Sequence, residues 1–493
     1  MPITAYDFDV VVVGAGPVGS LLTAELALQG VRVGLLEALV APTGRSKAGT
    51  LHARTAQVLE RRGLLELVAV NQSGRGPVPF HFAGMFDLDL AEVVDEGPAI
   101  VGSPQAYAER VFAEQAIGRG AEVFRGEEVV NLTDHGDHVS VQTAEGRFTA
   151  RYVVGCDGPR SAVRKSAGIP FTGTEATVAA MLGEVQLLDP YNAPQGWQRN
   201  ERGWTMVSAS LRGPSRIFAY DFRGPHENRD APLTLEEFSQ TVDYIAGRHV
   251  PMTDAGWLTR FGDAALQAEQ YRKGNVFVAG DAAHVHFPAG GQGVNLGLQD
   301  ALNLGWKLAA AVHGWAPPGL LDTYHSERHP IGARVLWNVR AQVALMQPDP
   351  RVDWLRDLFR ELMGLDQVNE YLGRMISGMD VAYDVGLPDA PLAGELAPDL
   401  RLKTSEGIIT VARLQHEGKA FLLDLAARAD LRAVAAGRPD QLEVVSATAD
   451  SWVGTDALLV RPDGYVAWSA RGRDDDPITL DRAIARWFGP ALV

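Results

Sequence analysis

A short apolar run followed at once by glycine occurs three times in the chain, over residues 10–13, 152–154 and 276–279. Each run is typical of a buried parallel strand, and each leads into a turn that contains glycine or aspartate. Apolar residues at helical spacing follow the first run over 20–29 and the third run from Val294 onward. This pattern predicts an α/β fold in which buried strands alternate with helices.

The first run opens a β-α-β unit whose second strand, over 31–36, ends at Glu37. In such a unit Gly14 permits the tight turn, Gly16 lets a pyrophosphate approach the backbone, and Gly19 allows close packing of helix on strand. A carboxylate about 20 residues further along binds ribose hydroxyls. The spacing therefore favours a dinucleotide site over the plainer interpretation, a structural turn with an incidental acid.

The third run ends at Gly280-Asp281 and is followed by a glycine-rich turn over 289–293. A strand, a glycine turn and a helix start direct backbone N–H groups toward an anion or the electron-rich edge of a ring. Asp281 stands at the strand end, where its carboxylate is placed to accept hydrogen bonds from a sugar or polyol. Alone, this stretch is also compatible with an ordinary tight turn.

The middle of the chain alternates apolar and polar residues over 178–185, 204–211 and 216–221, which predicts strands of an antiparallel sheet. Residues 71–102 are rich in glycine and proline with weaker alternation, and we expect them to form short strands that leave the first domain. The aromatic residues of both regions are interpreted either as a plain sheet core or as a wall for a flat aromatic substrate. The candidates for that wall are Phe80, Phe82, Trp204, Tyr220 and Phe222.

The remaining segments predict further helices and a small C-terminal domain. Ser103 as N-cap and Pro104 in the first turn predict a helix that runs to Gly118. Residues 389–398 predict a linker, and the order of elements after it suits a thioredoxin-like α/β domain. That domain contains no cysteine, so a redox role through C-x-x-C is excluded. The other expected elements are helices over 306–312, 321–343, 352–376, 430–436 and 478–487, and strands over 421–425, 442–447, 457–461 and 465–469.

Charge and cysteine content narrow the class of protein. The 493 residues carry a formal net charge of −16, which argues against nucleic acid or an anionic membrane surface as a partner. No apolar run predicts a transmembrane helix, and the acidic N-terminus is not typical of a signal peptide. The single cysteine, Cys156, excludes an internal disulfide and a cysteine-rich metal site, and we expect it to be buried rather than nucleophilic. We therefore expect a cytoplasmic protein without a metal ion.

Three motifs together carry a resemblance: Gly14-x-Gly16-x-x-Gly19 with Glu37, Cys156-Asp157-Gly158, and Gly280-Asp281 with residues 288–295. On these motifs the chain resembles the single-component FAD-dependent aromatic hydroxylases of the para-hydroxybenzoate hydroxylase class, over most of its length. It is most similar to the aromatic polyketide hydroxylases of antibiotic pathways, especially the angucycline oxygenases. Residues 324–329 and 376–378 also resemble stretches of that subgroup.

The resemblance implies a set of FAD-binding residues. The ADP half would be held by Gly14, Gly16, Pro17, Gly19 and Glu37. Arg45 and Lys47 lie where the class places two basic residues near the flavin, and an arginine is often found at the second. Gln105 would contact the cofactor, and Asp157 with Gly158 is associated with both FAD and NAD(P)H. Gly280 and Asp281 would bind the ribityl chain, and the isoalloxazine ring would be lined by Pro288, Gly290, Gly291, Gly293, Val294 and Asn295.

The resemblance also implies an activity. NADPH or NADH would reduce FAD, and O₂ would then give a flavin C4a-hydroperoxide that hydroxylates a polycyclic, angucycline-type aromatic polyketide in antibiotic biosynthesis. The protein would stabilise negative charge on the flavin and exclude water. A phenolic substrate supplies much of its own activation, so no side chain need act as a strict general base. His284 and His286 are candidates for proton transfer, and the alternative is that they only pack in the fold. A homodimer is compatible with the sequence.

Other functions remain open at this stage. The same flavin chemistry would serve a Baeyer–Villiger oxygenase or a hydroxylase of simple phenols. From a different class, an NAD-dependent dehydrogenase would use the first β-α-β unit, but it leaves the turns at Asp157-Gly158 and Gly280-Asp281 without a task. A non-catalytic flavin-binding module is a further alternative.

The predicted architecture is an α/β chain with a Rossmann-like FAD-binding domain at its centre. That domain is expected over 1–175, with the excursion 71–102, and is completed by 263–388. An antiparallel-sheet substrate domain over 176–262 interrupts it. The thioredoxin-like domain without cysteines is expected over 399–493.

Overall fold

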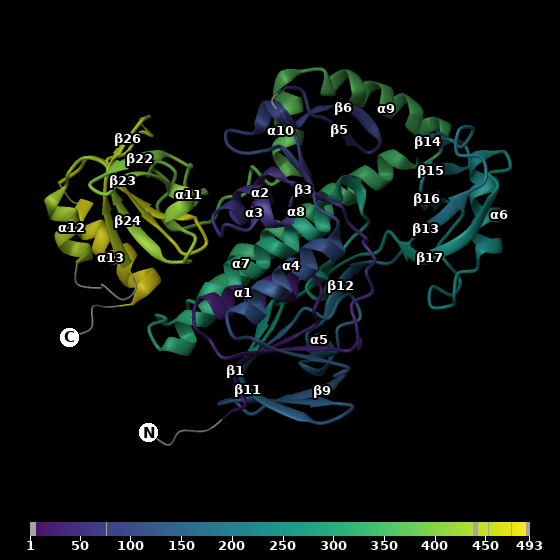
Figure 1. Cartoon of the computed structure of the whole chain (residues 1–493). Helices are drawn as coiled ribbons and strands as arrows, with labels where there is room; N and C mark the ends of the chain where they lie inside the picture. The colour runs from purple at the N-terminus through teal and green to yellow at the C-terminus, as the bar shows by residue number, and fades with distance from the viewer. Residues whose placement is uncertain (1–5, 75, 437–441, 452, 475, 490–493) are drawn as a thin grey trace.

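A computed structural model describes residues 6–74, 76–436, 442–451, 453–474 and 476–489, and its arrangement is shown in Figure 1. Long helices occupy the middle of the molecule in this view, and the largest sheet lies below them. An antiparallel sheet lies on one side of these helices, and the C-terminal unit, in yellow, lies on the other.

The central sheet has eight strands in the described residues, with the path β19-β20-β11-β1-β2-β8. From β20 to β8 the neighbours are parallel, so their carboxyl ends share one edge of the sheet. Alternate residues of β1 enter two different apolar clusters, which explains its continuous run of valines. The strands are β1 (Phe8–Val13), β2 (Val33–Glu37), β8 (Glu122–Arg125), β11 (Arg147–Gly155), β19 (Arg272–Lys273) and β20 (Val276–Val278), with β9 (Val129–Asp134) and β10 (Val139–Thr143) antiparallel beside β11.

Helix α1 (Pro17–Leu28) packs on both α4 (Gln105–Gly118) and α7 (Gln292–His313), and Figure 1 shows these three helices over the central sheet. Short elements connect the central sheet to the rest of the molecule. These are α2 (Ala53–Glu60), α3 (Leu65–Val68), α5 (Ala162–Ser166), β3 (Thr50–His52), β4 (Asn71–Gln72), β7 (Ile100–Gly102), β12 (Phe171–Thr174), β18 (Ala265–Ala268), β21 (His284–Val285), η2 (Gly280–Ala282) and η3 (Ala289–Gly291).

The second sheet is antiparallel, with five strands in the order β14-β15-β16-β13-β17. One face packs on α6 (Leu235–Ala246) through residues such as Val207 and Ile217. The other face carries Ala180, Trp204 and Tyr220 and belongs to a different apolar cluster. The strands are β13 (Ala179–Leu187), β14 (Gly196–Asn200), β15 (Gly203–Ser208), β16 (Ser215–Asp221) and β17 (Met252–Gly262).

A hairpin and three helices join the two sheets. The hairpin consists of β5 (Pro79–Phe82) and β6 (Met85–Asp89), and η1 (Leu90–Val93) follows it. It shares an apolar cluster with the inner face of the second sheet and with residues of α8, α9 and α10. These helices are α8 (Asp322–Met346), α9 (Pro350–Met363) and α10 (Asp366–Ser377).

The C-terminal unit contains a four-stranded sheet of order β25-β24-β27-β28 with α12 and α13 packed against it. The strands expected over 457–461 and 465–469 are confirmed as β27 and β28, which pair as an antiparallel hairpin. Its elements are β22 (Arg401–Thr404), β23 (Gly407–Thr410), α11 (Val411–Leu414), β24 (Ala420–Asp424), α12 (Ala429–Ala435), β25 (Leu442–Ser446), β26 (Thr448–Ala449), β27 (Ala457–Val460), β28 (Val466–Ser469) and α13 (Asp476–Phe488).

Several expected boundaries were wrong. Helix α4 begins at Gln105 with Pro104 as its N-cap, and Ser103 does not cap it, since the buried Ser103 hydroxyl has no partner among the described residues. The helix expected over 352–376 is two helices that meet near Gly364. The expected linker 389–398 is packed against the C-terminal unit. The Gly394 N–H donates to the Val466 carbonyl, and the Ala397 N–H donates to the Gly464 carbonyl.

The antiparallel region also contains elements that the sequence analysis did not predict, namely α6, β14 and β17. A screen of the described helices for length and hydropathy identifies none suited to crossing a bilayer. The described residues also contain no cluster of three or more His, Cys, Asp and Glu side chains able to hold a metal ion.

Candidate functional site

The three motifs meet at one edge of the central sheet. Gly14 follows β1, Cys156-Asp157 follows β11 and Gly280 follows β20, and these strands are neighbours in the parallel sheet. A Cβ atom at Gly14 would lie 2.5 Å from the Cys156 carbonyl oxygen, so the first two turns are in direct contact. One at Gly280 would lie 3.0 Å from the Val18 side chain, which brings the third turn against α1. The three motifs that carry the resemblance are therefore neighbours in the fold, as a shared FAD site requires.

The turn after β1 leaves space above Gly16. A Cβ atom at Gly16 would meet nothing within 4 Å, and Gly16 is the N-cap of α1 without any side-chain cap. The Glu37 carboxylate lies beside this turn and accepts hydrogen bonds from Ala15 N–H at 2.7 Å and Leu39 N–H at 2.9 Å. A carboxylate has further lone pairs, so these two bonds orient Glu37 and leave it able to accept hydrogen bonds from ribose hydroxyls.

Asp157 has one oxygen fixed and one free. Its Oδ2 accepts hydrogen bonds from the N–H groups of Ala162 at 2.7 Å and Val163 at 3.2 Å. Its Oδ1 is buried and has no partner among the described residues. Burial raises the pKa of Asp157, because the loss of water around the ionised form outweighs the hydrogen bonds that its carboxylate accepts. An unpartnered buried oxygen at this edge suits a ligand that donates a hydrogen bond.

The glycine-rich turn, defined here as residues 288–293, takes a backbone path that favours glycine. Gly290 and Gly291 both have positive φ angles, 73° and 65°. Helix α7 begins at Gln292, two residues earlier than expected, and Gly291 is its N-cap without a side-chain bond. Free N–H groups and the positive end of a helix dipole therefore face the region next to Pro288 and Gly291, which are both exposed.

Asn295 holds this turn against β3 rather than pointing away from it. Its Oδ1 accepts a hydrogen bond from His52 N–H at 2.8 Å, and its Nδ2 donates to the carbonyls of Thr50 and Gly291. Asp281 is exposed and makes no hydrogen bond with another described residue, so its carboxylate is free for a ligand. Gly293 and Val294 lie partly exposed in the first turn of α7.

The loop with Arg45 and Lys47 lies between the first turn and the second sheet. Both side chains are exposed, and the Arg45 guanidinium lies 5.8 Å from the centre of the Trp257 ring. Gln105 Oε1 accepts a hydrogen bond from Ala48 N–H at 3.3 Å, which ties the loop to α4. Arg216 of β16 donates to the carbonyls of Ser46 and Lys47, a bridge that the sequence analysis did not predict.

These features fit FAD. The uncapped space at Gly16 suits a pyrophosphate, Glu37 suits a ribose, and the free carboxylates of Asp157 and Asp281 suit hydroxyl groups along the chain between the two halves. The uncapped N-terminus of α7 suits the electron-rich edge of the isoalloxazine ring. FAD supplies redox and oxygen-activating chemistry when it is bound.

The inner face of the second sheet presents three rows of side chains. Strand pairing aligns Trp204, Tyr220, Ala180 and Phe261 in the first row, and Met206, Phe218, Leu182 and Thr259 in the second. The third row contains Ser208, Arg216, Glu184 and Trp257. The face therefore changes from aromatic to polar along the strands.

The aromatic row lies against the glycine-rich turn. The Tyr220 ring centre is 5.1 Å from that of Phe287, and Phe261 lies 6.0 Å from Phe287 on the same side. The middle row is more open, since Met206, Phe218 and Thr259 are only half-buried. Trp197 stacks on Tyr220 at 5.9 Å and extends the aromatic surface.

The other predicted wall residues lie in the same apolar cluster but at different places. Phe222 follows β16 and is half-buried. Phe80 lies 5.3 Å from His52, next to the glycine-rich turn, whereas Phe82 stacks on Phe359 of α9 at 5.2 Å. Trp204 donates its indole N–H to the Met346 carbonyl at 2.7 Å. Phe80 and Tyr220 thus contact residues next to the turn, whereas Phe82 packs against α9.

The two candidate histidines have different surroundings. His284 is 1% exposed, and its Nε2 lies 2.7 Å from Asp300 Oδ2, so one ring nitrogen already has a buried charged partner. His286 bonds the Phe287 carbonyl through Nδ1, and its buried Nε2 has no partner in the described chain. Burial lowers the pKa of His286, which keeps it neutral near pH 7. A proton-transfer role remains a prediction for both, and the geometry supports it more for His286.

His52 and His81 lie in the same region and were missed, because a single histidine in a sequence carries no sign of its surroundings. His52 Nε2 lies 2.8 Å from the Gly290 carbonyl, so that nitrogen carries the proton and donates to the turn. Burial lowers the pKa of His52 to about 4. Burial and repulsion from His52 lower the pKa of His81 to about 4 as well.

We expect acid to destabilise the protein before its carboxylates titrate. Both pKa values fall from 6.5 in the unfolded chain to about 4 in the fold, so the unfolded state binds more protons between these limits. Stability is therefore complete above about pH 6.5 and falls as the pH drops toward 4, by about 2 kcal/mol per histidine at pH 5. Thermal unfolding between pH 7 and pH 5 measures this.

A His52→Gln variant retains a donor for Gly290 and is expected to lose less stability over that pH range than the wild type. His249→Gln is the control, because the His249 side chain is 71% exposed. If His52→Gln and the wild type show the same pH dependence, the buried neutral histidine is not its source.

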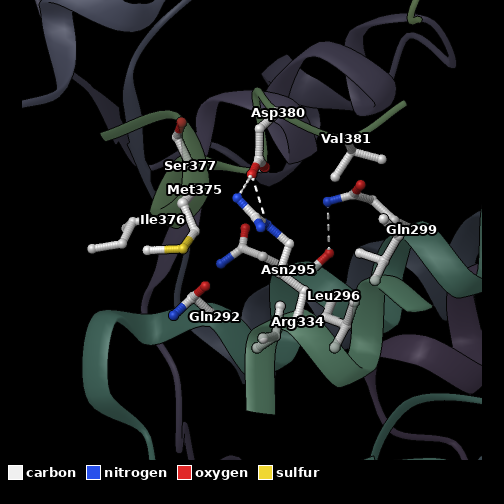
Figure 2. Close-up of a pocket in the computed structure, with 13 residues that line it drawn as sticks. Gln292, Asn295, Leu296, Gln299, Arg334, Met375, Ile376, Ser377, Asp380 and Val381 are labelled. Atoms are coloured by element: carbon white, nitrogen blue, oxygen red, sulfur yellow. Dashed lines mark hydrogen bonds and ion pairs between the residues drawn. The ribbon is translucent and has the colours of Figure 1, made fainter. Parts of the chain in front are cut away.

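A small cavity lies behind the first turns of α7, between α8 and α10, and Figure 2 shows its lining. Its volume is about 40 Å³, and Arg334 and Asp380 form an ion pair at its edge. Gln292 Nε2 and Gln299 Oε1 are buried there without partners among the described residues. Apolar side chains such as Leu296, Val335 and Met375 make up much of its lining, and the unpartnered amide groups of Gln292 and Gln299 suit ordered water.

Comparison with known proteins agrees with this geometry. Residues 7–339 match the family model described as FAD binding domain, and residues 390–491 match that described as aromatic-ring hydroxylase, C-terminal. The first match covers all three motifs, and the second covers the C-terminal unit.

Relatives match along the whole chain. Rifampicin monooxygenase of Streptomyces venezuelae is 41% identical over 487 residues, covering 98% of this chain and 99% of that protein. Dialkyldecalin synthase of Streptomyces rugosporus, whose name states no oxygenation, is 38% identical over 485 residues with 98% and 99% coverage. The solved structure of CabE, an aromatic hydroxylase from angucycline biosynthesis, has a TM-score of 0.91 and 40% identity, covering 98% of this chain and 100% of that one. This chain belongs to the family of FAD-dependent aromatic-ring hydroxylases, which are monooxygenases.

Proposed function

We propose that this monooxygenase uses NADPH or NADH and O₂ to hydroxylate a polycyclic aromatic polyketide of the angucycline type. The observation that supports this substrate class is the half-open, three-row face of the second sheet, which lies next to the glycine-rich turn. A flat molecule of several fused rings covers two such rows, whereas a single phenol covers one. CabE is described as an aromatic hydroxylase from angucycline biosynthesis, and the name rifampicin monooxygenase also states an oxygenation.

In this proposal the chain binds and orients both cofactor and substrate. Gly14, Gly16, Gly19 and Glu37 hold the ADP half, and the other predicted residues of the three motifs hold the rest. The N-terminus of α7 stabilises negative charge on the flavin ring. Tyr220, Phe261 and Phe287 pack against one end of the substrate and exclude water from the reacting carbon.

Proton transfer in this proposal depends mainly on the substrate. A phenol or quinol ring carries the electron density that attracts an activated oxygen atom, so a strict general base is unnecessary. His286 Nε2 is an unpartnered titratable atom beside the glycine-rich turn, and a Cβ at Gly293 would lie 3.6 Å from it. It is the side chain of this region best placed to hold a proton.

The purified protein is expected to bind FAD and to oxidise NADPH or NADH faster when an anthraquinone-like phenol is present. Oxygen uptake, peroxide release and product mass are measured together, with a monocyclic phenol as the comparison substrate. Incorporation of one oxygen atom with little peroxide release supports the proposal. The ratio of NADPH to NADH rates shows which donor is preferred.

Other outcomes point to other functions. A protein that takes up no flavin contradicts the whole proposal. A ring-expanded ester identifies a Baeyer–Villiger oxygenase, and preference for the monocyclic phenol identifies a simple phenol hydroxylase. Substrate conversion without oxygen uptake would indicate a reaction of the kind suggested by the name dialkyldecalin synthase.

We also propose, from the sequence and from these relatives, that the enzyme acts in the cytoplasm as part of an antibiotic pathway. The limits of the three domains, the thioredoxin-like character of the C-terminal unit and the homodimer remain predictions. Gel filtration of the flavin-loaded protein tests the last of these.

A further inference from the structure

A chain of buried charges connects the C-terminal unit to the turn that carries Asp281. Its members are Asp300, Asn303 and Lys307 of α7, Glu327 and Arg328 of α8, and Arg461 and Asp463 of the β27–β28 hairpin. No member is more than 6% exposed. We call this set the buried ionic chain.

The C-terminal end of the buried ionic chain is Arg461. Its two terminal nitrogens donate to the Glu327 carboxylate at 2.6 and 3.0 Å, and its Nε donates to Asp463 at 3.0 Å. The aromatic rings of Tyr383, Tyr465, Trp306 and Trp487 surround the guanidinium within 4.5–6.0 Å. Arg461 is therefore inserted from one unit into the helices of the other.

Glu327 connects Arg461 to both helices. Its Oε2 accepts hydrogen bonds from Asn303 at 2.6 Å and Lys307 at 2.7 Å. Burial alone would raise the pKa of Glu327, but Arg461 and Lys307 lower it to about 2. The carboxylate is ionised at every physiological pH, so its position depends on these cations.

The next residue, Arg328, connects α8 to the flavin-side turn. Its Nε donates to Asp300 Oδ1 at 2.8 Å, and its Nη1 donates to the Tyr383 hydroxyl at 3.1 Å. Asp300 Oδ2 then accepts hydrogen bonds from Gly280 N–H at 3.2 Å and from His284 at 2.7 Å. Gly280 immediately precedes Asp281, the residue predicted to bind the ribityl chain.

We propose that the C-terminal unit positions the Gly280-Asp281 turn for flavin binding, and that Arg461 is its positioning residue. The three cations and three carboxylates of the buried ionic chain balance, and charge-assisted bonds join its side chains in two groups, one around Glu327 and one around Arg328. Loss of Arg461 removes the cation that pairs with Asp463 and two of the bonds that fix Glu327. The disturbance reaches Asp300 because Glu327 and Arg328 are consecutive residues of α8.

This inference rests on the proposed flavin site and predicts a selective effect. The buried ionic chain ends at Gly280, whereas the ADP half of FAD is assigned to Gly14, Gly16 and Glu37 on other strands. An Arg461→Met variant should therefore bind FAD about tenfold more weakly and bind ADP as the wild type does. A general loss of stability would instead weaken both ligands together.

The experiment measures dissociation constants of FAD and of ADP for apoprotein, by quenching of flavin fluorescence and by calorimetry. Arg428→Met is the matched control, because Arg428 pairs with Asp430 and Asp476 in the same unit, away from Glu327. Glu327→Gln is the second variant in case Arg461→Met does not fold. It keeps the side-chain volume and should show the same loss for FAD alone.

The outcomes separate this inference from the proposed function. If the wild type binds no FAD, the proposed function fails. If the wild type binds FAD and Arg461→Met or Glu327→Gln binds it equally well, or loses ADP to the same extent, the positioning role is wrong. If both single variants lose FAD affinity and the double variant loses no more than either, the two residues act along one path, as proposed.

Discussion

A Gly19→Ala variant is expected to lose about 3 kcal/mol of unfolding free energy, whereas Gly16→Ala should fold like the wild type and lose FAD. A Cβ atom at Gly19 would lie 1.9 Å from the Gly14 carbonyl oxygen, so α1 must move away from β1. At Gly16 a Cβ atom meets nothing within 4 Å, and φ is −68°, which alanine adopts without strain. The added methyl group would occupy the space assigned to the pyrophosphate.

Chemical denaturation and FAD titration of both variants test this pair. Gly16→Ala should bind FAD at least about tenfold more weakly at unchanged stability. The assignment of the pyrophosphate to this turn is contradicted if Gly16→Ala binds FAD as tightly as the wild type. Normal stability of Gly19→Ala would show that the close contact with Gly14 is not required.

An Arg328→Met variant is expected to lose about 3–5 kcal/mol of unfolding free energy, because it removes one partner of a fully buried ion pair. Arg328 is 0% exposed, and Asp300 would keep its charge with only His284 and Gly280 as partners. Burial alone would raise the pKa of Asp300, but His284 and Arg328 hold it below its usual range. Without Arg328 this carboxylate should take up a proton at higher pH.

Urea denaturation at pH 7 measures the loss, and the same experiment at pH 5 should show a smaller difference from the wild type as Asp300 becomes neutral in the variant. Arg351→Met serves as the control, since the Arg351 side chain is 89% exposed and pairs with the neighbouring Asp349 at the surface. Equal stability of Arg328→Met and Arg351→Met would contradict the importance of the buried pair.

The convergence of the three motifs could be predicted from the sequence because it follows from one geometric rule. Buried runs that end at Val13, Gly155 and Ala279 read as parallel strands, and parallel strands place their carboxyl ends on one edge. Glycine spacing then assigned the turns. The position of Glu37 at the end of β2 followed for the same reason.

The antiparallel region was harder to predict because its patterns are mixed. Strand β17 contains glycine, aspartate and an exposed stretch, so its alternation is weak. Helix α6 had a usable signal that was missed: Thr234 caps it three residues before Glu237, and Phe238, Val242 and Ile245 form its buried stripe. The edge strand β14 has no fully buried residue and therefore no clear pattern.

Contacts between distant charged residues could not be predicted. Arg461 pairs with Glu327 across 134 positions of the chain, and nothing in either local sequence distinguishes this pair among the many arginines and carboxylates. The same holds for His52, whose pairing with Gly290 depends on the fold that surrounds both. Local periodicity determines elements, but the choice of partners across elements depends on the packed structure.

The three-row face of the second sheet is aromatic at one end and polar at the other, so its two ends favour different parts of a ligand. Tyr220 and Phe261 lie at one end, and Arg216 and Glu184 lie at the other. Successive rows are two residues apart on each strand. An elongated ring system with one apolar end and one oxygenated end has one favourable orientation along such a surface. For the proposed substrate we therefore expect the fit at the two ends to decide which carbon is oxidised, and a change of side chain at either end to shift the site of reaction.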